Sequence, residues 1–380
     1  MNVFQAFNFL SANNRKPFNH WCKSDDICLS FSRSAFSIKL ITSWRQRIYK
    51  DKDVIVWLPD FFCNESLVLL RQLGVKIIFY PVDELCNPSW SKFPTKILDF
   101  PDLFFLVHYF GKPSPSKKAI EFCKLHNAWL VEDAAHALEP ETGIGDFGDI
   151  VLYSPHKHFS IPDGALLIVR DNGPSELGLQ EGNFHTLFDM YSIMASGPRR
   201  LDKISIFWFI KRLLQVLGVR AKKKKIDFNL DSQPILTNEE NAAMSKISNK
   251  LLNTDLERIT TIRNHRKDCA KKWALSLEAF IPNSEAEFKD IDFTPYLTYI
   301  TFKDHSSAKF FFDIMQKASL PVSTWPDLPQ EVINSKVNHL SAFNLRHSRI
   351  YLPVHQTVSY SKIDYYVKKL NKTMIKKRYV

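Results

Sequence analysis

Between residues 54 and 169, short apolar runs alternate with segments of helical spacing. Uninterrupted apolar runs of this length are typical of strands buried on both faces. They predict strands at 54–58, 75–80, 103–107, 129–131, 150–153 and 165–169. Helices are expected over 64–73, ending at Gly74, and after Ser114, which can cap a helix with Pro115 at its first position. The alternation predicts an α/β fold with a mostly parallel sheet flanked by helices.

Residues 172–231 interrupt this rhythm. Within 204–219, apolar residues recur at helical spacing: Ile206, Phe209, Ile210, Leu213 and Leu217. The basic residues Arg220 and Lys222–Lys225 follow directly. We expect the stripe to pack on the protein body. The alternative is a helix that lies on a membrane surface.

The last part of the chain predicts a smaller α+β unit. We expect a long helix over 238–273, a strand over 294–302, a helix over 306–317, a short strand over 320–323 and a final helix over 362–370. A chain of 380 residues exceeds what one hydrophobic core usually supports. We therefore expect a large domain over 1–235, with a basic insert at about 172–231, and a small domain over 236–380.

Composition narrows the class of protein. The chain is 45% hydrophobic and 24% charged, as in ordinary globular proteins, and its net charge is +11. The lysine-rich runs lack interleaved aromatic residues, so we expect solvated loops or tails rather than a nucleic-acid site. An anionic substrate or an anionic membrane surface would explain the excess charge equally well. No stretch approaches the roughly 20 apolar residues of a membrane span, and the N-terminus lacks the pattern of a signal peptide. Six scattered cysteines fit free thiols, so we expect a cytoplasmic protein without a bound metal.

Candidate chemistry gathers where predicted strands end. Asp133 follows one strand, Ser154 follows the next, and Lys157 lies just beyond. Parallel sheets bind ligands at this edge. Pyridoxal phosphate requires a lysine for a Schiff base, a carboxylate for its ring nitrogen, and hydroxyl and backbone N–H groups for its phosphate. Taken singly, Asp133 fits a helix cap and Lys157 a surface lysine, but their order and spacing favour a cofactor site.

Three consecutive motifs carry a resemblance to a known family. Glu132–His136 reads E-D-A-A-H, residues 145–150 read G-D-F-G-D-I, and residues 153–157 read Y-S-P-H-K. They resemble the DegT/StrS family of nucleotide-sugar aminotransferases, which have the type I pyridoxal-phosphate (aspartate aminotransferase) fold. The resemblance implies pyridoxal phosphate as cofactor. It makes Lys157 the Schiff-base lysine, places Asp133 at the ring nitrogen and His136 near the phenolic oxygen, and assigns Ser154 to the phosphate.

Weaker similarities extend along the chain. Residues 32–35, S-R-S-A, stand where the family has S-G-T-A, which implies that Arg33, Ser34 and Ala35 lie at the phosphate. Residues 58–63, L-P-D-F-F-C, correspond to a strand end whose ring stacks on the cofactor, here Phe62. The segments H-Y-F-G at 108–111 and L-P-V-H at 352–355 are similar to further family segments.

The chain departs from the family pattern at three places. The lysine loop is shorter, and without a gap Phe159 would take the position of the lysine. A two-residue deletion instead aligns Asp163-Gly164 with the family's E-G pair. Arg33 replaces a glycine. The loop that brings an asparagine from the second subunit is not recognisable, with Asn229 and Asn238 as candidates.

The resemblance implies a homodimeric aminotransferase. It would move an amino group, with glutamate as the expected donor, to a nucleotide-linked keto-sugar in surface-polysaccharide or lipopolysaccharide synthesis. Three alternatives stay open. One is a dehydratase of the same fold, a branch that carries histidine at the lysine position, and His156 and His158 flank Lys157 here. The others are a non-catalytic cofactor-binding protein and a membrane-peripheral scaffold built on the basic insert.

Overall fold

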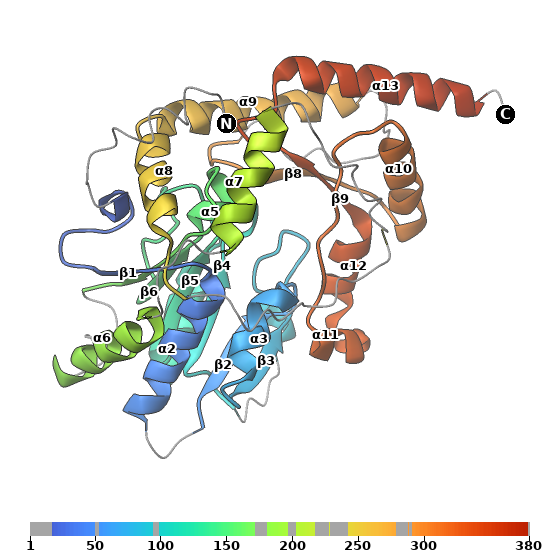
Figure 1. The fold of residues 1–380 in the computed structure, drawn as a ribbon. Helices are drawn as coiled ribbons and strands as arrows, with labels where there is room; N and C mark the ends of the chain where they lie inside the picture. Colours follow the sequence, from blue (N-terminus) through green and yellow to red (C-terminus); the bar gives the residue numbers. More distant parts are fainter. Residues whose placement is uncertain are drawn as a thin grey trace.

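A seven-stranded sheet forms the centre of the protein, and a smaller unit of helices around two strands lies beside it (Figure 1). The computed structural model describes residues 17–49, 53–93, 99–171, 181–196, 203–216, 228, 242–278, 288 and 291–378. Within them, no helix is both long and apolar enough to cross a membrane.

The predicted mostly parallel sheet is confirmed. Its strand order is β1-β7-β6-β5-β4-β2-β3. The strands are β1 (Ile27–Phe31), β2 (Ile55–Pro59), β3 (Lys76–Tyr80), β4 (Leu103–Val107), β5 (Trp129–Ala134), β6 (Ile150–Tyr153) and β7 (Ala165–Val169). Only β7 runs antiparallel to its neighbours β6 and β1. The connection from β6 to β7 spans residues 154–164, which is shorter than the crossover that a parallel neighbour requires. The chain therefore turns back at the carboxyl end of β6.

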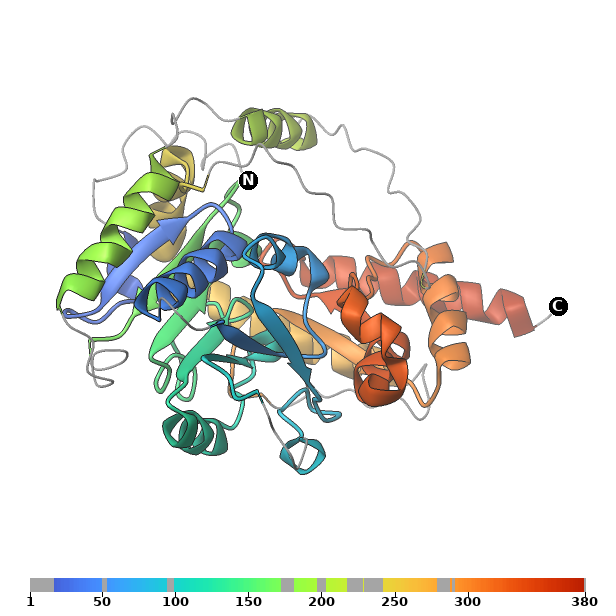
Figure 2. The same cartoon turned by 90° about the horizontal axis from the view of Figure 1, so that it is seen from below.

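Helices cover both faces of the sheet (Figure 2). On one face, α2 (Ser34–Ile48) and α6 (Glu181–Ala195) pack together, and α4 (Lys117–His126) lies on the other. The inward side of α2 carries Ile38, Ile41 and Trp44, all fully buried in the main core. Short helical segments, η2 (Asn64–Leu67) and α3 (Val68–Arg71), connect β2 to β3. The sheet is thus buried on both faces, as the uninterrupted apolar runs predict.

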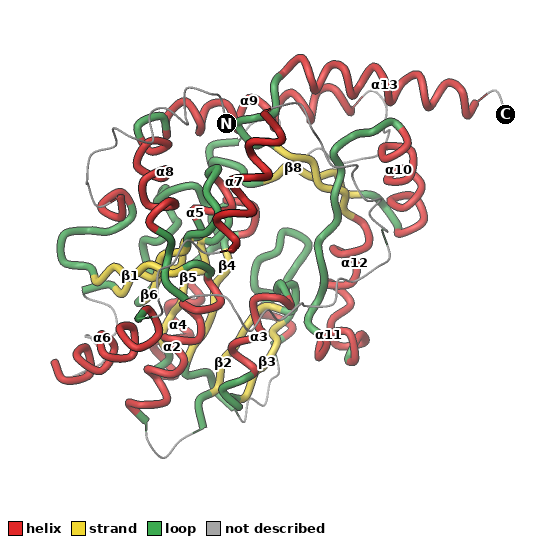
Figure 3. The backbone as a smooth tube through the Cα atoms, viewed as in Figure 1, coloured by secondary structure: helices red, strands yellow, loops and turns green. Residues whose placement is uncertain are grey.

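The smaller unit contains a two-stranded antiparallel sheet, drawn in yellow in Figure 3. Its strands are β8 (Leu297–Thr301) and β9 (Arg349–Pro353). The surrounding helices are α9 (Ile259–Glu278), α10 (His305–Lys317), α11 (Gln330–Asn334), α12 (Leu340–Ser348) and α13 (Tyr360–Arg378). Helix α8 (Lys246–Leu256) instead packs against the large sheet, where its Leu251 and Leu252 belong to a second apolar cluster. Thr294 and Tyr296, just before β8, and Gln356, after β9, hydrogen-bond to loops of the large sheet.

Several predicted boundaries are wrong. Ser114 does not cap a helix: α4 begins at Lys117, and the Ser114 N–H donates to Nδ1 of His108 at 3.0 Å. The single helix expected over 238–273 is two helices, α8 and α9. The strand expected at 320–323 is only an isolated bridge between Ser323 and Tyr351. Strands β1 and β9 and helices α2 and α6 lack a strong periodic pattern and were not anticipated.

The expected packing of the apolar stripe on the protein body is also wrong. Helix α7 (Lys203–Val216) forms as predicted, but Ile206, Phe209, Ile210 and Leu213 are exposed. Trp208, which lies off the stripe, packs against the second apolar cluster. Leu217 lies outside the described residues.

Candidate active site

A cavity of about 400 Å³ lies where β2, β4 and β5 end and α2 begins. The residues that line it come from the large sheet and its loops, together with one tryptophan from the smaller unit. They are Arg33, Ser34, Ala35, Phe36, Ile38, Phe61, Phe62, Cys63, Glu65, Ser66, Val68, Leu69, Val107, Tyr109, Asp133, Ala135, His136, His156, Lys157 and Trp325. Every predicted site residue except Ser154 lines this one cavity.

Asp133 lies near the end of β5, with its side chain 7% exposed. Its Oδ1 accepts a hydrogen bond from the Ala135 N–H at 3.0 Å, and its backbone oxygen accepts one from His108. Burial raises the pKa of the Asp133 carboxyl, and the positive charge of Lys157 only partly opposes this. Because burial destabilises the ionised form of Asp133, a cationic N–H group beside the carboxylate would stabilise it.

His136 is held as a neutral imidazole. The backbone N–H of Phe110 donates to its Nδ1 at 3.2 Å, so the ring proton lies on Nε2. Desolvation lowers the pKa of His136 well below its usual value, and the Lys157 charge adds to this effect. The ring stacks on Tyr296, with centroids 4.6 Å apart.

The backbone around Phe110 is built to present that N–H. Phe110 has a φ of 60°, a left-handed conformation that is rare outside glycine. The Tyr296 N–H donates to the Phe110 oxygen at 2.8 Å, which helps to hold the conformation. At the next residue, Gly111, a Cβ would lie 2.3 Å from the Thr294 oxygen, so only glycine fits. The H-Y-F-G segment therefore positions His136.

Lys157 lies in the turn that reverses the chain between β6 and β7. It belongs to the short helix α5 (Pro155–His158), directly after Ser154 at the end of β6. Within the described part of the chain, its ammonium group forms no ion pair or hydrogen bond. The Phe159 ring does not line the cavity but packs edge-on against Trp21 in a second apolar cluster, with centroids 6.4 Å apart. The cavity therefore contains Lys157 and not Phe159.

Arg266 and Gln356, from the smaller unit, form hydrogen bonds to the turn that contains Lys157. Arg266 in α9 is 1% exposed and donates to the backbone oxygen of His158 at 3.0 Å. Gln356 donates to the same oxygen at 2.9 Å and accepts from Arg266 at 3.2 Å. Burial lowers the pKa of Arg266 to about 10, so the group remains a cation at neutral pH. Residues distant in sequence thus fix the backbone next to Lys157.

The far side of the same turn is anchored to α8. Asp163 accepts hydrogen bonds from the backbone N–H and the hydroxyl of Ser245, both at 3.1 Å. The Gly164 N–H donates to the Ser32 oxygen at 2.9 Å. The Asp163-Gly164 pair, predicted to follow the lysine, therefore joins the turn to the strand that leads into α2.

The start of α2 provides polar groups for an anion. Ser34 and Ala35 occupy its first two positions, where backbone N–H groups have no partner within a helix. The hydroxyl of Ser34 is hydrogen-bonded to that of Ser154, which brings Ser154 next to the cavity. Arg33 donates to the Pro162 oxygen at 3.4 Å. A helix N-terminus, two hydroxyls and a guanidinium are suited to a phosphate group.

His156 also lines the cavity, and it is neutral. Its Nδ1 donates to the Gly164 oxygen at 2.8 Å. Desolvation, assisted by the charge of Arg33, lowers the pKa of His156 to about 3. The other flanking histidine, His158, is fully buried and does not line the cavity.

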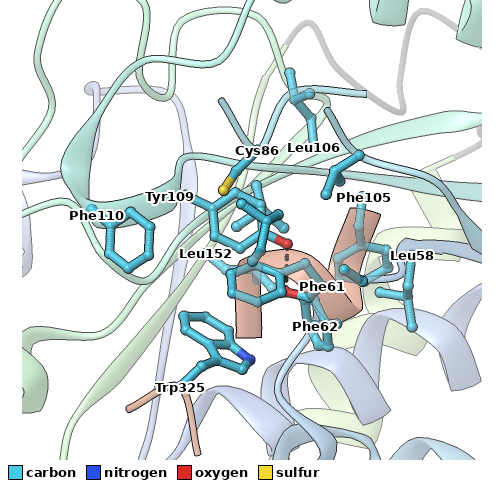
Figure 4. Close-up of a cluster of buried hydrophobic side chains, with 14 of the residues drawn as sticks. Leu58, Phe61, Phe62, Cys86, Phe105, Leu106, Tyr109, Phe110, Leu152 and Trp325 are labelled. Atoms are coloured by element: carbon cyan, nitrogen blue, oxygen red, sulfur yellow. Dashed lines mark hydrogen bonds between the residues drawn. The ribbon is translucent and has the colours of Figure 1, made fainter. Parts of the chain in front are cut away.

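Aromatic side chains line one side of the cavity. Figure 4 shows Phe61, Phe62, Tyr109 and Trp325 in one buried cluster. Phe61 and Phe62 follow β2, and Phe61 stacks on Trp325 with centroids 4.4 Å apart. The Tyr109 hydroxyl donates to the Phe61 oxygen at 2.7 Å. Phe62 was predicted here, whereas Trp325 was missed because it lies in a loop of the smaller unit without a sequence signal. Tyr109 could have been found, since it belongs to the H-Y-F-G segment.

Glu132, next to Asp133, has a structural role. Its carboxylate accepts from His108 Nε2 at 2.7 Å and from the N–H groups of Gly145, Phe147 and Gly148. Burial alone would raise the pKa of Glu132, but these hydrogen bonds outweigh it and lower the pKa. The G-D-F-G segment is thereby fixed to β5. The candidate partner-subunit residues Asn229 and Asn238 lie outside the described residues.

Solved structures share this fold across nearly the whole chain. An aminotransferase, TlmJ, from Streptoalloteichus hindustanus matches with a TM-score of 0.68 and 15% identity, covering 98% of this chain and 95% of that one. PseC of Helicobacter pylori, an aminotransferase of pseudoaminic acid biosynthesis, matches with a TM-score of 0.70 and 14% identity, covering 99% and 97%. The predicted type I fold is confirmed.

Sequence comparison reaches less of the chain. An uncharacterised protein, MJ1066, from Methanocaldococcus jannaschii is 29% identical over 119 residues, which are 30% of this chain and 31% of that protein. Residues 23–180 match the sequence profile of the DegT/DnrJ/EryC1/StrS aminotransferase family. This region includes every predicted site residue. Residues 23–180 are therefore similar in sequence to the DegT/DnrJ/EryC1/StrS aminotransferases, a family that uses pyridoxal phosphate.

Proposed function

We propose that this protein is an aminotransferase that moves an amino group, with glutamate as donor, to a nucleotide-linked keto-sugar. The observation that carries the proposal is that one cavity is lined by Lys157, Asp133 and the N-terminus of α2. The proposed setting is surface-polysaccharide or lipopolysaccharide synthesis in the cytoplasm. The sugar substrate is supported by the solved structures of PseC and of a sugar aminotransferase, Spr1654, from Streptococcus pneumoniae.

The residues that line the cavity fit pyridoxal phosphate. Buried Asp133, whose pKa is raised by desolvation, would be stabilised as a carboxylate by a protonated pyridine nitrogen. Ser34, Ser154 and the N–H groups of α2 would hold the phosphate, and Phe62 would contact the ring. When bound, the cofactor supplies an aldehyde conjugated to an electron-accepting ring.

In the proposed reaction, Lys157 would transfer protons and His136 would donate a hydrogen bond. Once neutral, the Nζ of Lys157 can remove the proton from the Cα of the amino donor and return it elsewhere, as a general base and acid. His136 carries its proton on Nε2 and stays neutral, because its Nδ1 is occupied by the Phe110 N–H. It can therefore donate a hydrogen bond to an oxygen in the cavity without adding charge.

A dehydratase of the same fold is the second candidate. The observation that favours it is His156, which lines the cavity next to Lys157. Its Nδ1 is engaged by the Gly164 oxygen, which leaves only Nε2 to act on a substrate. The presence of Lys157 in the same cavity favours amino transfer.

The proposal is tested by the visible spectrum of the cofactor-loaded protein before and after addition of glutamate. We expect the bands of the bound cofactor to change within one turnover, because the amino group is transferred to it. A keto-sugar should then restore the original spectrum. Release of water and a deoxy-sugar instead would identify the dehydratase, and no change with any amino acid would identify a non-catalytic protein.

Lys157 itself is tested by borohydride reduction of the loaded protein and peptide mapping. The pyridoxyl group should be found on Lys157, since this is the lysine that lines the cavity. The variant Lys157→Ala should bind the cofactor without being labelled, and Lys246→Ala, which removes a lysine at the start of α8, should be labelled normally. A label on any other lysine would show that the two-residue deletion is placed wrongly.

A further inference from the structure

Helix α7 presents a broad apolar face to solvent. Ser205 is buried and Trp208 packs against the second apolar cluster, so this side of the helix faces the body. Six large apolar side chains on other sides are exposed: Ile206 42%, Phe207 70%, Phe209 40%, Ile210 48%, Leu213 56% and Leu214 41%. With about 100° between successive residues, these positions fill one continuous arc opposite the side that faces the body.

This apolar face differs from ordinary exposed residues. Single exposed apolar side chains are common on protein surfaces, but a continuous apolar face marks an interaction site. The helix lies at the outside of the molecule, at the top of Figure 2, and contacts the second apolar cluster through Trp208. The cavity does not include any residue of α7. The face is therefore available to something other than the substrate.

The sequence of α7 and of the residues that follow it, up to residue 225, carries charge of a single sign. Residues 203–225 contain eight basic residues and no acidic residue. The basic residues are Lys203, Lys211, Arg212, Arg220 and Lys222–Lys225. Arg212 lies over the Trp208 ring, with its guanidinium carbon 5.3 Å from the ring centroid. A binding partner must offer apolar surface and negative charge together.

We propose that α7 docks the protein on the surface of an anionic lipid bilayer. A bilayer offers hydrocarbon beneath a layer of negative head groups, which suits an apolar helical face of phenylalanine, isoleucine and leucine with adjacent lysines. A second copy of the chain suits it less. An isologous contact across α7 would bring together two copies of a helix that contains three basic residues and no acidic residue, and their repulsion opposes association. The proposal does not depend on the reaction that the cavity performs.

The test is co-sedimentation of the full-length, cofactor-loaded protein with vesicles at low and at high salt. One set contains phosphatidylglycerol and phosphatidylcholine, and the other contains phosphatidylcholine alone. We expect the protein to sediment with the anionic vesicles at low salt only. Each lysine near a charged surface strengthens binding roughly five-fold, so replacing Lys222–Lys225 with glutamine should weaken it on the order of 100-fold or more.

Matched control variants test whether binding depends on this face rather than on nonspecific apolar contacts or on net charge. Phe207→Ser with Leu213→Ser should abolish sedimentation, whereas Leu125→Ser with Val337→Ser, at positions 78% and 83% exposed elsewhere, should not. The charge control replaces four exposed lysines, Lys92, Lys117, Lys118 and Lys124, with glutamine. This control removes the same net charge from the opposite side of the molecule.

Three results would overturn the proposal. The first is wild-type protein that stays in solution with anionic vesicles at low salt. The second is a charge control that weakens binding as much as the loss of Lys222–Lys225 does. The third is an apolar face covered by another copy: light scattering would then show that the Phe207→Ser and Leu213→Ser protein loses a dimer that the wild type forms.

Discussion

At the scale of single residues, burial gives the site its chemistry. Asp133 and His136 lie three residues apart and line the same cavity, and desolvation shifts the pKa of both side chains. The pKa of Asp133 is raised because desolvation outweighs the nearby Lys157 cation. Desolvation lowers the pKa of His136, because the charged form of histidine is a cation, and the Lys157 charge lowers it further. Asp133 is thus suited to pairing with a cation, and His136 is suited to donating a hydrogen bond as a neutral ring.

Replacing Asp133 with asparagine should reduce turnover by roughly 100-fold to 1,000-fold, because the protonated ring loses its electrostatic partner while the shape of the site is kept. The half-reaction with glutamate measures this loss, and circular dichroism checks that the fold is intact. Glu139→Gln is the matched control, since Glu139 is a buried carboxylate that pairs with Arg263 and His20 outside the cavity. Near-normal turnover in Asp133→Asn would remove Asp133 from the site.

The same substitution should have a pH-dependent effect on the stability of the cofactor-free protein. The folded-state pKa of Asp133 is above its ordinary value of 3.8. As pH rises from that value, the unfolded chain loses its proton first, so the folded state becomes relatively less stable. Asparagine does not titrate. The free energy of unfolding of Asp133→Asn relative to the wild type should therefore increase as pH rises through this window, in urea unfolding series at several pH values.

At the scale of elements, the short turn between β6 and β7 determines where Lys157 lies. Its eleven residues cannot make a parallel crossover, so β7 runs back and Lys157 stays at the edge of the sheet. The turn has little internal structure of its own beyond α5. Its conformation comes from outside, through Arg266 and Gln356 on one side and Asp163 with Ser245 on the other.

Replacing Arg266 with methionine should weaken cofactor binding about 10-fold, because the His158 oxygen loses a charged hydrogen-bond donor worth about 1.5–3 kcal/mol and the turn around Lys157 relaxes. Equilibrium dialysis measures the dissociation constant. Arg346→Met is the control: Arg346 is also fully buried, but it donates to the Phe228 oxygen, away from the turn. Both variants should lose thermal stability, and an equal loss of cofactor binding in both would contradict a role of Arg266 in positioning Lys157.

At the scale of the whole molecule, the cavity needs more positive charge than the described residues of this chain supply. Among the described residues, Arg33 and Lys157 are the only lysine or arginine side chains that line it, and the two histidines there are held neutral. A phosphate dianion and an anionic substrate would leave the site short of cations. A second subunit is the natural source of the missing groups.

We therefore expect a homodimer with two-fold symmetry, the commonest arrangement of identical subunits. Multi-angle light scattering should give twice the mass of the chain, 44.2 kDa. The dimer should persist in the Phe207→Ser and Leu213→Ser protein, because α7 is assigned to a different surface. A monomer that binds the cofactor tightly would show that one chain completes the site by itself.

The strands of the large sheet, except β1, and the candidate site residues could be predicted from the sequence alone. Strands buried on both faces appear as uninterrupted apolar runs, and β4, β6 and β7 begin and end where those runs do. Asp133, Ser154 and Lys157 could be predicted because all three lie at the ends of such strands. Their spacing is local, and local patterns are what a sequence displays directly.

The three-dimensional packing was needed to show which residues support the site and which surfaces are exposed to solvent. Trp325 and Arg266 reach the site from more than a hundred residues away, and no periodicity marks contacts of that kind. The stripe of α7 was assigned to the wrong environment for a related reason. An apolar helical face has the same sequence pattern whether it packs on its own protein or faces outward, and only the position of the helix distinguishes the two.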